Sequence, residues 1–268
     1  MLSSVIKDEL TLQAIQQGLD THLIGRHISY FSRLASTMDT AREAALAGSA
    51  EGTVILAEEQ TSGRGRLERR WLSPRGGLAL SIILYPEACH LPGLVMVAAL
   101  AVADAVTMTT SVKAEIKWPN DVLVGGKKIS GILAEAGMRT DSQGYAVVGL
   151  GVNVNLNPAL YPEIGAIATS LSAETGRTHS RVMVLQALLT RFEYWYEMLA
   201  GGGPVFQAWR NCLATIGKEV QVLAGDVSYT GVAEDVASDG ALLLRLKDDR
   251  LIKLPAGDVT LKASAATP

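Results

Sequence analysis

The sequence predicts an α+β fold with two domains of very unequal size. Over roughly the first 215 residues, runs typical of helices and runs typical of strands follow one another in mixed order. From Lys218 to Lys262 only short β-type runs remain, separated by turns such as Ser238-Asp239-Gly240. Five short strands in about 45 residues are typical of a small barrel of the SH3 type. We therefore expect one domain over residues 1–215 and a barrel over residues 216–268.

Capping residues and apolar runs define the elements of the first 110 residues. Ser36 and Thr37 open a stretch of helix-forming residues and Gly48 follows it, which indicates a short capped helix. The continuous apolar character of residues 94–110 predicts a long helix. The other elements expected here are a weak helix over 8–20 and buried strands over 53–57 and 78–85.

A compact β segment and two helices are expected before the barrel. Gly125-Gly126 separates two short apolar runs, which is a strong hairpin signal. Residues 181–199 carry apolar side chains at helical spacing, and a short helix containing Trp209 follows. The expected strands of this half are 114–118, 122–124, 129–135 and 145–155, and those of the barrel are 219–223, 228–234, 241–245, 250–254 and 258–261.

Net charge, cysteine usage and the longest apolar run exclude several classes of protein. Lys and Arg number 24 against 27 Asp and Glu, so no basic field covers the chain that would by itself hold nucleic acid. Cys89 and Cys212 have no Cys or His at metal-ligand spacing, which favours two reduced thiols over a disulfide or a zinc site. There is no secretory signal, and Leu94–Met108 is too short to span a bilayer. We expect a cytoplasmic protein that binds neither membrane nor DNA.

A segment rich in arginine and glycine follows the expected strand 53–57. It reads T-S-G-R-G-R at residues 61–66, and Arg69, Arg70, Trp71 and Arg75 come next. Glycine lets the backbone approach an anion closely, and a guanidinium group matches phosphate or carboxylate with two hydrogen bonds. One interpretation is a loop that closes over a phosphorylated or carboxylated ligand, and the alternative is a solvated basic loop. Nucleic-acid binding is less favoured, because the segment has a single aromatic residue for stacking on bases.

A second cluster, K-W-P-N-D at residues 117–121, combines polar side chains with an aromatic ring at the end of a strand. Trp118 and Asn120 could stack on and read a purine, and Lys117 could meet a phosphate group. Pro-Asn-Asp is also ordinary turn chemistry, so the cluster by itself favours a β-turn over a ligand site.

A third cluster occupies residues 125–133, where two lysines precede a strand that contains Gly131. A glycine within a strand often marks a ligand close to the backbone, although a charged hairpin tip with a bulge explains the same residues. The sequence G-L-G-V-N-V-N at 149–155 lacks the third glycine and the following helix of a dinucleotide fingerprint. Serine-hydrolase and phosphate-binding-loop patterns are absent from the sequence as well.

Taken together, the order and spacing of these motifs closely resemble those of biotin protein ligases. The resemblance extends from about residue 26 to residue 263. It implies a mixed central sheet flanked by helices, of the type found in class II synthetases, followed by an SH3-like barrel. The motifs that carry it are S-T-M-D at 36–39, E-E-Q-T-S-G-R-G-R at 58–66, W-L-S-P at 71–74, K-W-P-N-D at 117–121, K-I-S-G-I-L-A-E at 128–135 and G-L-G-V-N-V-N at 149–155.

The resemblance implies an ATP-dependent, AMP-forming ligase. Members of the family activate biotin with Mg-ATP to biotinyl-5′-AMP and release pyrophosphate. They then transfer biotin to one lysine of the biotin carboxyl carrier domain of a carboxylase such as acetyl-CoA carboxylase. ATP and Mg²⁺ are thus cosubstrate and ion, biotin is a substrate, and no tightly bound prosthetic group is expected. A monomer and a homodimer both fit the family.

The resemblance also implies roles for individual residues. Lys128, Arg64 and Arg66 would neutralise the reacting carboxylate and α-phosphate, and Asp121 would orient or deprotonate the acceptor lysine. Trp71 would stack on adenine, and no residue is expected to hold a metal ion. The implied biotin-binding residues are Ser36, Thr37, Met38, Gln60, Gly63, Arg64, Gly65, Arg66, Lys128 and Gly131, and the implied nucleotide-binding residues are Trp71, Lys117, Asn120 and Asn153, with the loop 156–167 completing the pocket.

Two positions depart from the family's pattern. Leu67-Glu68 stands where Arg-Gly is common, so we expect a stiffer loop with a weaker positive field. Met38 stands where Asn is frequent, which a contact through the backbone would tolerate. About 25 residues precede the resemblance, so we expect a monofunctional ligase without an N-terminal DNA-binding domain. The alternatives are a lipoate or octanoyl ligase or transferase of the same fold and, less favoured, a nucleic-acid-binding module.

Overall fold

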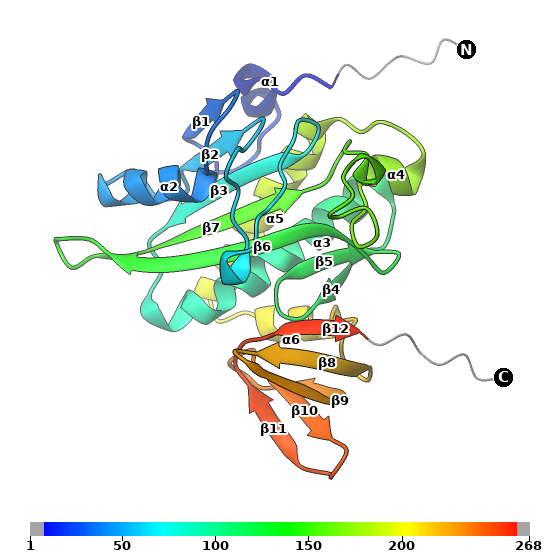
Figure 1. The fold of residues 1–268 in the computed structure, drawn as a ribbon. Coiled ribbons are helices and arrows are strands. Elements are labelled where there is room, and N and C mark those ends of the chain that lie inside the picture. Colours follow the sequence, from blue (N-terminus) through cyan, green and yellow to red (C-terminus); the bar gives the residue numbers. More distant parts are fainter. Residues whose placement is uncertain (1–7, 262–268) are drawn as a thin grey trace.

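The computed structural model describes residues 8–261, and the expectations for residues 1–7 and 262–268 lie outside this range. The described chain forms a seven-stranded mixed sheet and a separate five-stranded antiparallel sheet (Figure 1). The strands of the first sheet are β1 (Ile28–Phe31), β2 (Val54–Ala57), β3 (Leu78–Leu84), β4 (Glu115–Lys117), β5 (Asp121–Val124), β6 (Lys127–Met138) and β7 (Gly144–Val152). Those of the second are β8 (Glu219–Ala224), β9 (Val227–Val236), β10 (Leu242–Leu246), β11 (Leu251–Leu254) and β12 (Asp258–Leu261).

Helices lie on both faces of the mixed sheet. The α-helices are α1 (Leu12–Gln17), α2 (Thr37–Leu46), α3 (Leu94–Thr110), α4 (Leu171–Thr175), α5 (Arg181–Ala200) and α6 (Val205–Asn211), and the 3₁₀ helices are η1 (Arg66–Glu68), η2 (Ala88–Gly93) and η3 (Pro158–Leu160). The first sheet has the order β1-β2-β3-β7-β6-β5-β4, with β1 parallel to β2 and all other pairs antiparallel. The second has the order β11-β10-β9-β8-β12. The expected α+β fold with an SH3-like C-terminal sheet is confirmed.

Most expected elements are present, and a few were missed. α3 begins and ends at the expected residues, and the five C-terminal strands lie within two residues of their expected bounds. β6 extends to Met138, beyond the expected end at Glu135. β1 and α4 were not expected, because each has at most five residues and too few apolar positions to show a periodicity.

The two faces of the mixed sheet bury separate sets of side chains. Val54 and Leu56 of β2 belong to the main core, whereas Ile55 between them packs in a smaller cluster under α2. α2 contacts β2, β3 and β7, while α3 and α5 pack against each other on the opposite face. Because both faces are covered, all seven residues of β3 are buried.

The longest apolar stretch of the chain is a core element. Residues from Ala88 to Thr110, which comprise η2 and α3, are long and apolar enough to cross a membrane by length and composition. The helix is instead packed inside the protein, where α3 contacts α5, β6 and β7. The expectation that this stretch is too short to span a bilayer therefore understated its length.

Polar groups at the start of α2 fix its position over the sheet. The Ser36 side chain caps the helix by accepting a hydrogen bond from the backbone N–H of Asp39 at 3.3 Å. The helix ends before Gly48, whose φ of +86° is the left-handed conformation that glycine adopts without strain. This placement directs Thr37 and Met38 toward the sheet, where both are buried.

Trp118 joins the mixed sheet to the C-terminal sheet. Its side chain is fully buried, and its indole Nε1–H donates to the Gly240 carbonyl at 2.8 Å. Its backbone N–H donates to Thr215 Oγ1 at 2.9 Å, and the Trp118–Pro119 peptide bond is cis. The interpretation of Trp118 as a residue that stacks on a purine is therefore wrong, because a ring with no exposed surface cannot contact a ligand.

The packing of α3 against α5 carries much of the core, and we expect Phe192→Ala to test it. Phe192 is fully buried on α5, so the substitution should lower the free energy of unfolding by about 3–5 kcal/mol through lost burial and a residual cavity. Met183 on the same helix is 62% exposed, and Met183→Ala should change the free energy by about 0.5 kcal/mol or less. Urea denaturation followed by circular dichroism measures both, and equal losses would contradict this account.

Candidate active site

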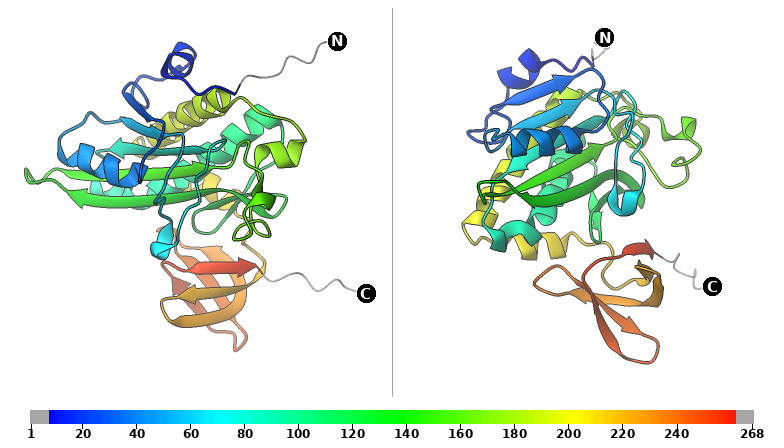
Figure 2. Two further views of the ribbon diagram at one scale, coloured as in Figure 1. Left: turned by 45° about the horizontal axis from the view of Figure 1, so that its top comes forward. Right: turned by 60° about the vertical axis from the view of Figure 1, so that its left-hand side comes forward.

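A cavity of about 210 Å³ lies on the α2 side of the mixed sheet, beneath the loop of residues 61–77. We call this segment the arginine loop; it crosses β6 and β7 and reaches toward the C-terminal sheet (Figure 2). Three implied site residues, Ser36, Gly63 and Lys117, do not line the cavity. The implied site residues that do line it are Thr37, Met38, Gln60, Arg64, Gly65, Arg66, Trp71, Asn120, Asp121, Lys128, Gly131 and Asn153.

A chain of hydrogen bonds fixes the polar end of the cavity. Gln60 Oε1 accepts from the Thr37 backbone N–H at 2.8 Å and from Thr37 Oγ1 at 3.0 Å. The buried Ser81 hydroxyl donates to Thr37 Oγ1 at 2.9 Å. These contacts determine the orientation of the Gln60 amide, since its oxygen is used twice. The Gln60 NH₂ group is thereby available to donate to a ligand.

Two paired glycines form the floor of the cavity, and Trp71 lies on them. Gly131 of β6 and Gly151 of β7 are directly opposite each other in the sheet. A β-carbon at Gly131 would lie 2.9 Å from the Trp71 ring, and one at Gly151 would overlap that ring. Gly149, two residues before Gly151 and therefore on the same face of β7, leaves room for the sulfur of Met38. The missing side chains thus create space for an aromatic ring against the backbone.

Lys128 and Asp121 face each other at the edge of this floor. Lys128 Nζ lies 2.6 Å from Asp121 Oδ1 and 5.3 Å from the centroid of the Trp71 ring. Lys117 Nζ lies 3.5 Å from the other oxygen of Asp121, so Lys117 contacts this carboxylate although it does not line the cavity. The ammonium group of Lys128 is held between an anion and an aromatic face, two contacts that restrict its position.

Arg64 connects the arginine loop to α2 and β6. Its guanidinium donates to Asp39 Oδ1 at 2.8 Å and to Glu135 Oε1 at 3.1 Å. Desolvation lowers the pKa of Arg64, but the two carboxylates outweigh it and the net pKa is raised. The Arg64 side chain remains 38% exposed at the mouth of the cavity. The guanidinium group of Arg64 is therefore accessible to an incoming anion, and Asp39 and Glu135 already hold it in position before the anion binds.

The tip of the arginine loop rests on the C-terminal sheet. Arg66 Nη1 donates to Asn120 Oδ1 at 3.0 Å and to the Gly257 carbonyl at 3.3 Å, and Arg69 pairs with Asp258. Burial lowers the pKa of Arg66, opposed by the nearby carboxylates. A guanidinium group stays protonated under these conditions, so Arg66 brings a desolvated positive charge to the cavity wall.

Three implied site residues also have structural partners. Asn120 Nδ2 donates to the Ile132 carbonyl at 2.7 Å, and Asn153 Nδ2 donates to the Thr169 carbonyl at 3.0 Å. Gly63 accepts from the Trp71 backbone N–H at 2.8 Å, and a β-carbon at Gly63 would lie 2.5 Å from the Trp71 carbonyl. Asn120 and Asn153 therefore line the cavity and hold its walls, whereas Gly63 acts through the loop backbone.

Comparison with known proteins assigns this arrangement to a family. The model of the Biotin/lipoate A/B protein ligase family matches residues 30–153, and that of the Biotin protein ligase C terminal domain matches residues 215–262. The bifunctional ligase/repressor BirA of Bacillus subtilis is 36% identical over 259 residues, which cover 94% of this chain and 79% of that protein. This chain belongs to the biotin protein ligase family.

Two further members support the assignment over nearly their whole length. The biotin–[acetyl-CoA-carboxylase] ligase of Paracoccus denitrificans is 35% identical over 240 residues, covering 84% of this chain and 98% of that protein. The biotin protein ligase of Aquifex aeolicus, solved in complex with biotin and ATP, matches with a TM-score of 0.76 and 29% identity. That match covers 89% of this chain and 100% of the Aquifex chain. The resemblance on which the sequence analysis relied is confirmed.

Several cavity residues of this family member were not assigned from the sequence. Gly149 and Gly151 could have been found, because glycines two residues apart in a strand leave one face bare. Asp258 gave no signal, since it lies in the C-terminal sheet and reaches the cavity only through the arrangement of the two sheets. The other unassigned lining residues are Leu67, Arg69, Arg70, Leu72, Leu80, Ile132, Leu133, Leu150 and Ala168; Ile164 and Ile167 belong to the expected loop.

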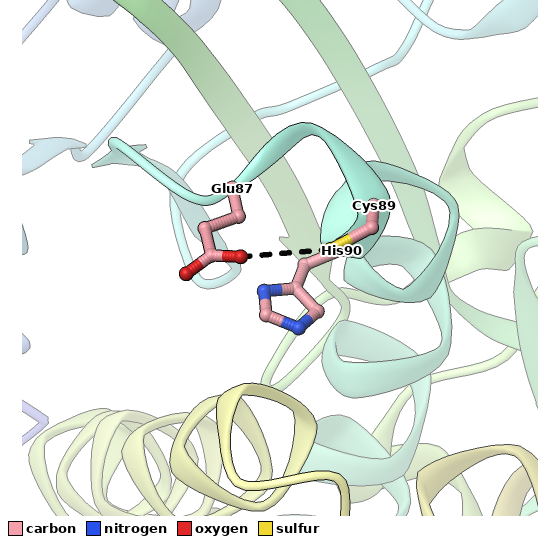
Figure 3. A group of neighbouring side chains, drawn as sticks. All are labelled: Glu87, Cys89 and His90. Atoms are coloured by element: carbon pink, nitrogen blue, oxygen red, sulfur yellow. Dashed lines mark hydrogen bonds between the residues drawn. The ribbon is translucent and has the colours of Figure 1, made fainter.

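Two groups of potential metal ligands among the described residues lie away from the cavity: His22, Glu193 and Glu197 form one, and Glu87, Cys89 and His90 form the other. The ligand atoms of Glu87, Cys89 and His90 lie within 4.8 Å of one another at the start of η2 (Figure 3). Cys89 Sγ lies 3.8 Å from Glu87 Oε2, and both of these side chains are exposed. No spacing in the sequence indicated this group, because His90 directly follows Cys89 in the chain.

The glycine floor yields a direct test of how Trp71 is placed. We expect Gly151→Ala to push the Trp71 ring off the sheet, because the added methyl group occupies the same space. Gly144→Ala on the same strand meets nothing within 4 Å and should leave the ring in place. A crystal structure of each variant shows the ring directly, and acrylamide quenching of tryptophan fluorescence should increase only for Gly151→Ala. An unmoved ring in that variant would contradict the packing.

Proposed function

We propose that this protein activates biotin with ATP to biotinyl-5′-AMP and then transfers biotin to a lysine of a biotin carboxyl carrier domain. The proposal rests on one observation above all: three cations, Arg64, Arg66 and Lys128, line a cavity together with Trp71 and the glycines beneath its ring, in a member of the biotin protein ligase family. A flat, partly apolar acid fits such a cavity, and its carboxylate needs cations nearby.

The cavity offers complementary ends for biotin. The Gln60 NH₂ group and the buried hydroxyl of Thr37 lie at one end, where they can bond the polar ureido group. Met38, which lies against the backbone of Gly149, provides an apolar surface for the ring and its chain. Lys128 lines the same cavity, where its ammonium group would meet the carboxylate at the end of the chain.

Activation requires two anions to approach each other. A biotin carboxylate oxygen attacks the α-phosphorus of ATP, a new C–O–P linkage forms, and the bond to the departing pyrophosphate breaks with its electron pair. Lys128, Arg64 and Arg66 are suited to offset the charge on the carboxylate and on the pentacovalent phosphorus. Trp71 would stack on adenine, and Asn153 with the loop near Ile164 would complete the nucleotide pocket.

Magnesium is proposed to enter with the nucleotide. The carboxylates among the described lining residues are Asp121 and Asp258, and each lies against a lysine or an arginine. Mg²⁺ usually keeps several waters and combines one or two carboxylates with substrate phosphates. The donor set therefore fits an ion carried by ATP better than an ion that the protein holds by itself. When bound, the ion would offset charge on the phosphates.

Transfer requires an uncharged amine next to the acyl group. The lysine nitrogen of the carrier domain attacks the biotinyl carbonyl carbon, an amide bond forms, and AMP leaves with the electrons of the C–O bond. Asp121 is our candidate for orienting the amine or accepting its proton. Its carboxylate faces the cavity and is positioned by Lys128 and Lys117. The proposed setting is the cytoplasm, and the assembly state remains a prediction of monomer or homodimer.

Incubation with substrates tests the proposal. Purified protein with biotin, Mg-ATP and a carrier domain should modify one lysine of that domain by the mass of a biotinyl group. Mass spectrometry with biotin, lipoate and octanoate in parallel distinguishes the acyl groups. Modification with lipoate or octanoate but not with biotin would overturn the proposal in favour of the related activities. A thermal shift with an oligonucleotide but not with biotin and ATP would favour a nucleic-acid-binding module.

The role proposed for Lys128 has a matched control next to it. We expect Lys128→Ala to reduce the rate of pyrophosphate release by about 10²–10³-fold, because the transition state loses a desolvated cation. Lys127→Ala changes a neighbouring exposed lysine that does not line the cavity and should keep the rate within a factor of about two. A coupled pyrophosphate assay measures both. Equal rates in the two variants would show that Lys128 has no part in activation.

A further inference from the structure

A single buried arginine contacts the two stems of the arginine loop, which are Glu58, three residues before the loop, and Gly77 at its end. Arg181, the first residue of α5, places Nη1 2.6 Å from Glu58 Oε1 and 3.3 Å from the carbonyl oxygen of Gly77. Glu58 directly follows β2, and Gly77 directly precedes β3. The whole segment between them, which roofs the cavity, therefore leaves and re-enters the sheet at one guanidinium group.

The same guanidinium is tied to the N-terminal segment. Arg181 Nε lies 2.8 Å from Asp8 Oδ2, and the Arg181 backbone N–H donates to Asp8 Oδ1 at 3.2 Å. Asn155 Nδ2 donates to Asp8 Oδ2 at 2.8 Å, and Tyr30 donates to the other oxygen of Glu58 at 3.1 Å. The Arg181 side chain is only 5% exposed, so one desolvated cation is shared by two carboxylates.

This contact determines how the loop leaves the sheet toward the cavity. Two residues after Glu58, Gln60 accepts from Thr37 and fixes the polar end of the cavity. The Gln60 backbone N–H donates to the Ser73 carbonyl at 3.0 Å, which joins the two stems of the loop above Arg181. A shift of the stems at Glu58 and Gly77 would therefore be passed on to Gln60 and to Trp71, both of which line the cavity.

We propose that Arg181 is a positioning residue for the ligase reaction, which clamps both stems of the arginine loop and makes Asp8 of the N-terminal segment part of the support of the active site. The proposal rests on the proposed function. It concerns neither the loop's own arginines nor the reacting atoms. Arg181 acts through Glu58 and Gly77, and its effect is to hold the arginine loop in place over the acyl-adenylate.

The geometry predicts that the forked shape of the Arg181 side chain matters, as well as its charge. A guanidinium is a planar fork that reaches Asp8, Glu58 and Gly77 at the same time, whereas an ammonium is a single point charge. Arg181→Lys therefore retains the charge between the two carboxylates but loses part of the clamp. Asp8→Asn is the second variant, which retains the side chain's shape and removes only the charge that ties the N-terminal segment to Arg181.

The matched control is Arg191→Lys on the same helix. Arg191 Nε lies 2.8 Å and Nη2 2.7 Å from Asp104 Oδ2, so this pair has the same chemistry and makes no contact with the arginine loop. Hydrogen–deuterium exchange of the ligand-free protein is the first measurement. Arg181→Lys should accelerate exchange over residues 59–76, and Arg191→Lys should not.

The second measurement is the half-life of biotinyl-5′-AMP on the protein. We expect Arg181→Lys to shorten it by about tenfold or more, with a rise in KM for biotin that exceeds the fall in kcat for pyrophosphate release. Asp8→Asn should shift exchange and retention in the same direction by less. A melting temperature lowered equally by Arg181→Lys and Arg191→Lys, with unchanged exchange and retention, would overturn the proposal and leave Arg181 a merely structural residue.

The two measurements also separate this proposal from the proposed function. Failure of the wild-type protein to form biotinyl-5′-AMP would reject the proposed function, and the exchange comparison would still report on the clamp. If Arg181→Lys does not fold, Asp8→Asn carries the test by itself, since it leaves the Arg181–Glu58 pair in place. Unchanged exchange over residues 59–76 in Asp8→Asn would then overturn the proposal.

Discussion

The candidate site depends on a place in the mixed sheet where side chains are missing. Gly131 and Gly151 lie opposite each other on β6 and β7, and their bare backbone accommodates the ring of Trp71. Glycine weakens a strand by removing packing and by gaining freedom in the unfolded chain. Here the strands that glycine weakens, β6 and β7, are the two longest of the mixed sheet, and they are paired with each other along nine residues. Lys128 and the arginine loop are both arranged around the ring that lies on this floor.

Several positive charges of the site are held by carboxylates of the protein itself. Arg64 is held by Asp39 and Glu135, Lys128 by Asp121, and Arg69 by Asp258. An anionic substrate must exchange partners with these carboxylates, which reduces the net gain in Coulomb energy. The compensation is that the cations are positioned before a ligand arrives, so less side-chain freedom is lost on binding. Such a site favours geometric selection of its ligand over simple attraction of negative charge.

Elements that depend on neighbouring residues were predicted well from the sequence. Features that depend on contacts between distant segments were not. The hairpin at Gly125-Gly126 and the cap at Ser36 depend on neighbouring residues and were found. β1 was missed because its four residues are too few to show a periodicity. Trp118 was misinterpreted, since a tryptophan at a strand end does not reveal which side it faces. The carboxylates that hold the cations come from α2, β5, β6 and β12, so only the folded chain brings them to Lys128 and to the arginine loop.

Strain at the tip of the arginine loop shows why it needs support. Leu67 has a φ of +54°, a left-handed conformation that costs a non-glycine residue about 1–2 kcal/mol, and its side chain is 65% exposed and gains little by packing. Its neighbours compensate, because Arg66 bonds Asn120 and Gly257 while Arg69 pairs with Asp258. The expected stiffening at Leu67-Glu68 thus takes the form of a strained turn anchored on the C-terminal sheet. A loop that is fixed at its tip and at both stems can open only if these polar contacts break. Ligand entry must therefore replace specific hydrogen bonds and ion pairs, and it does not depend on ordering a disordered loop.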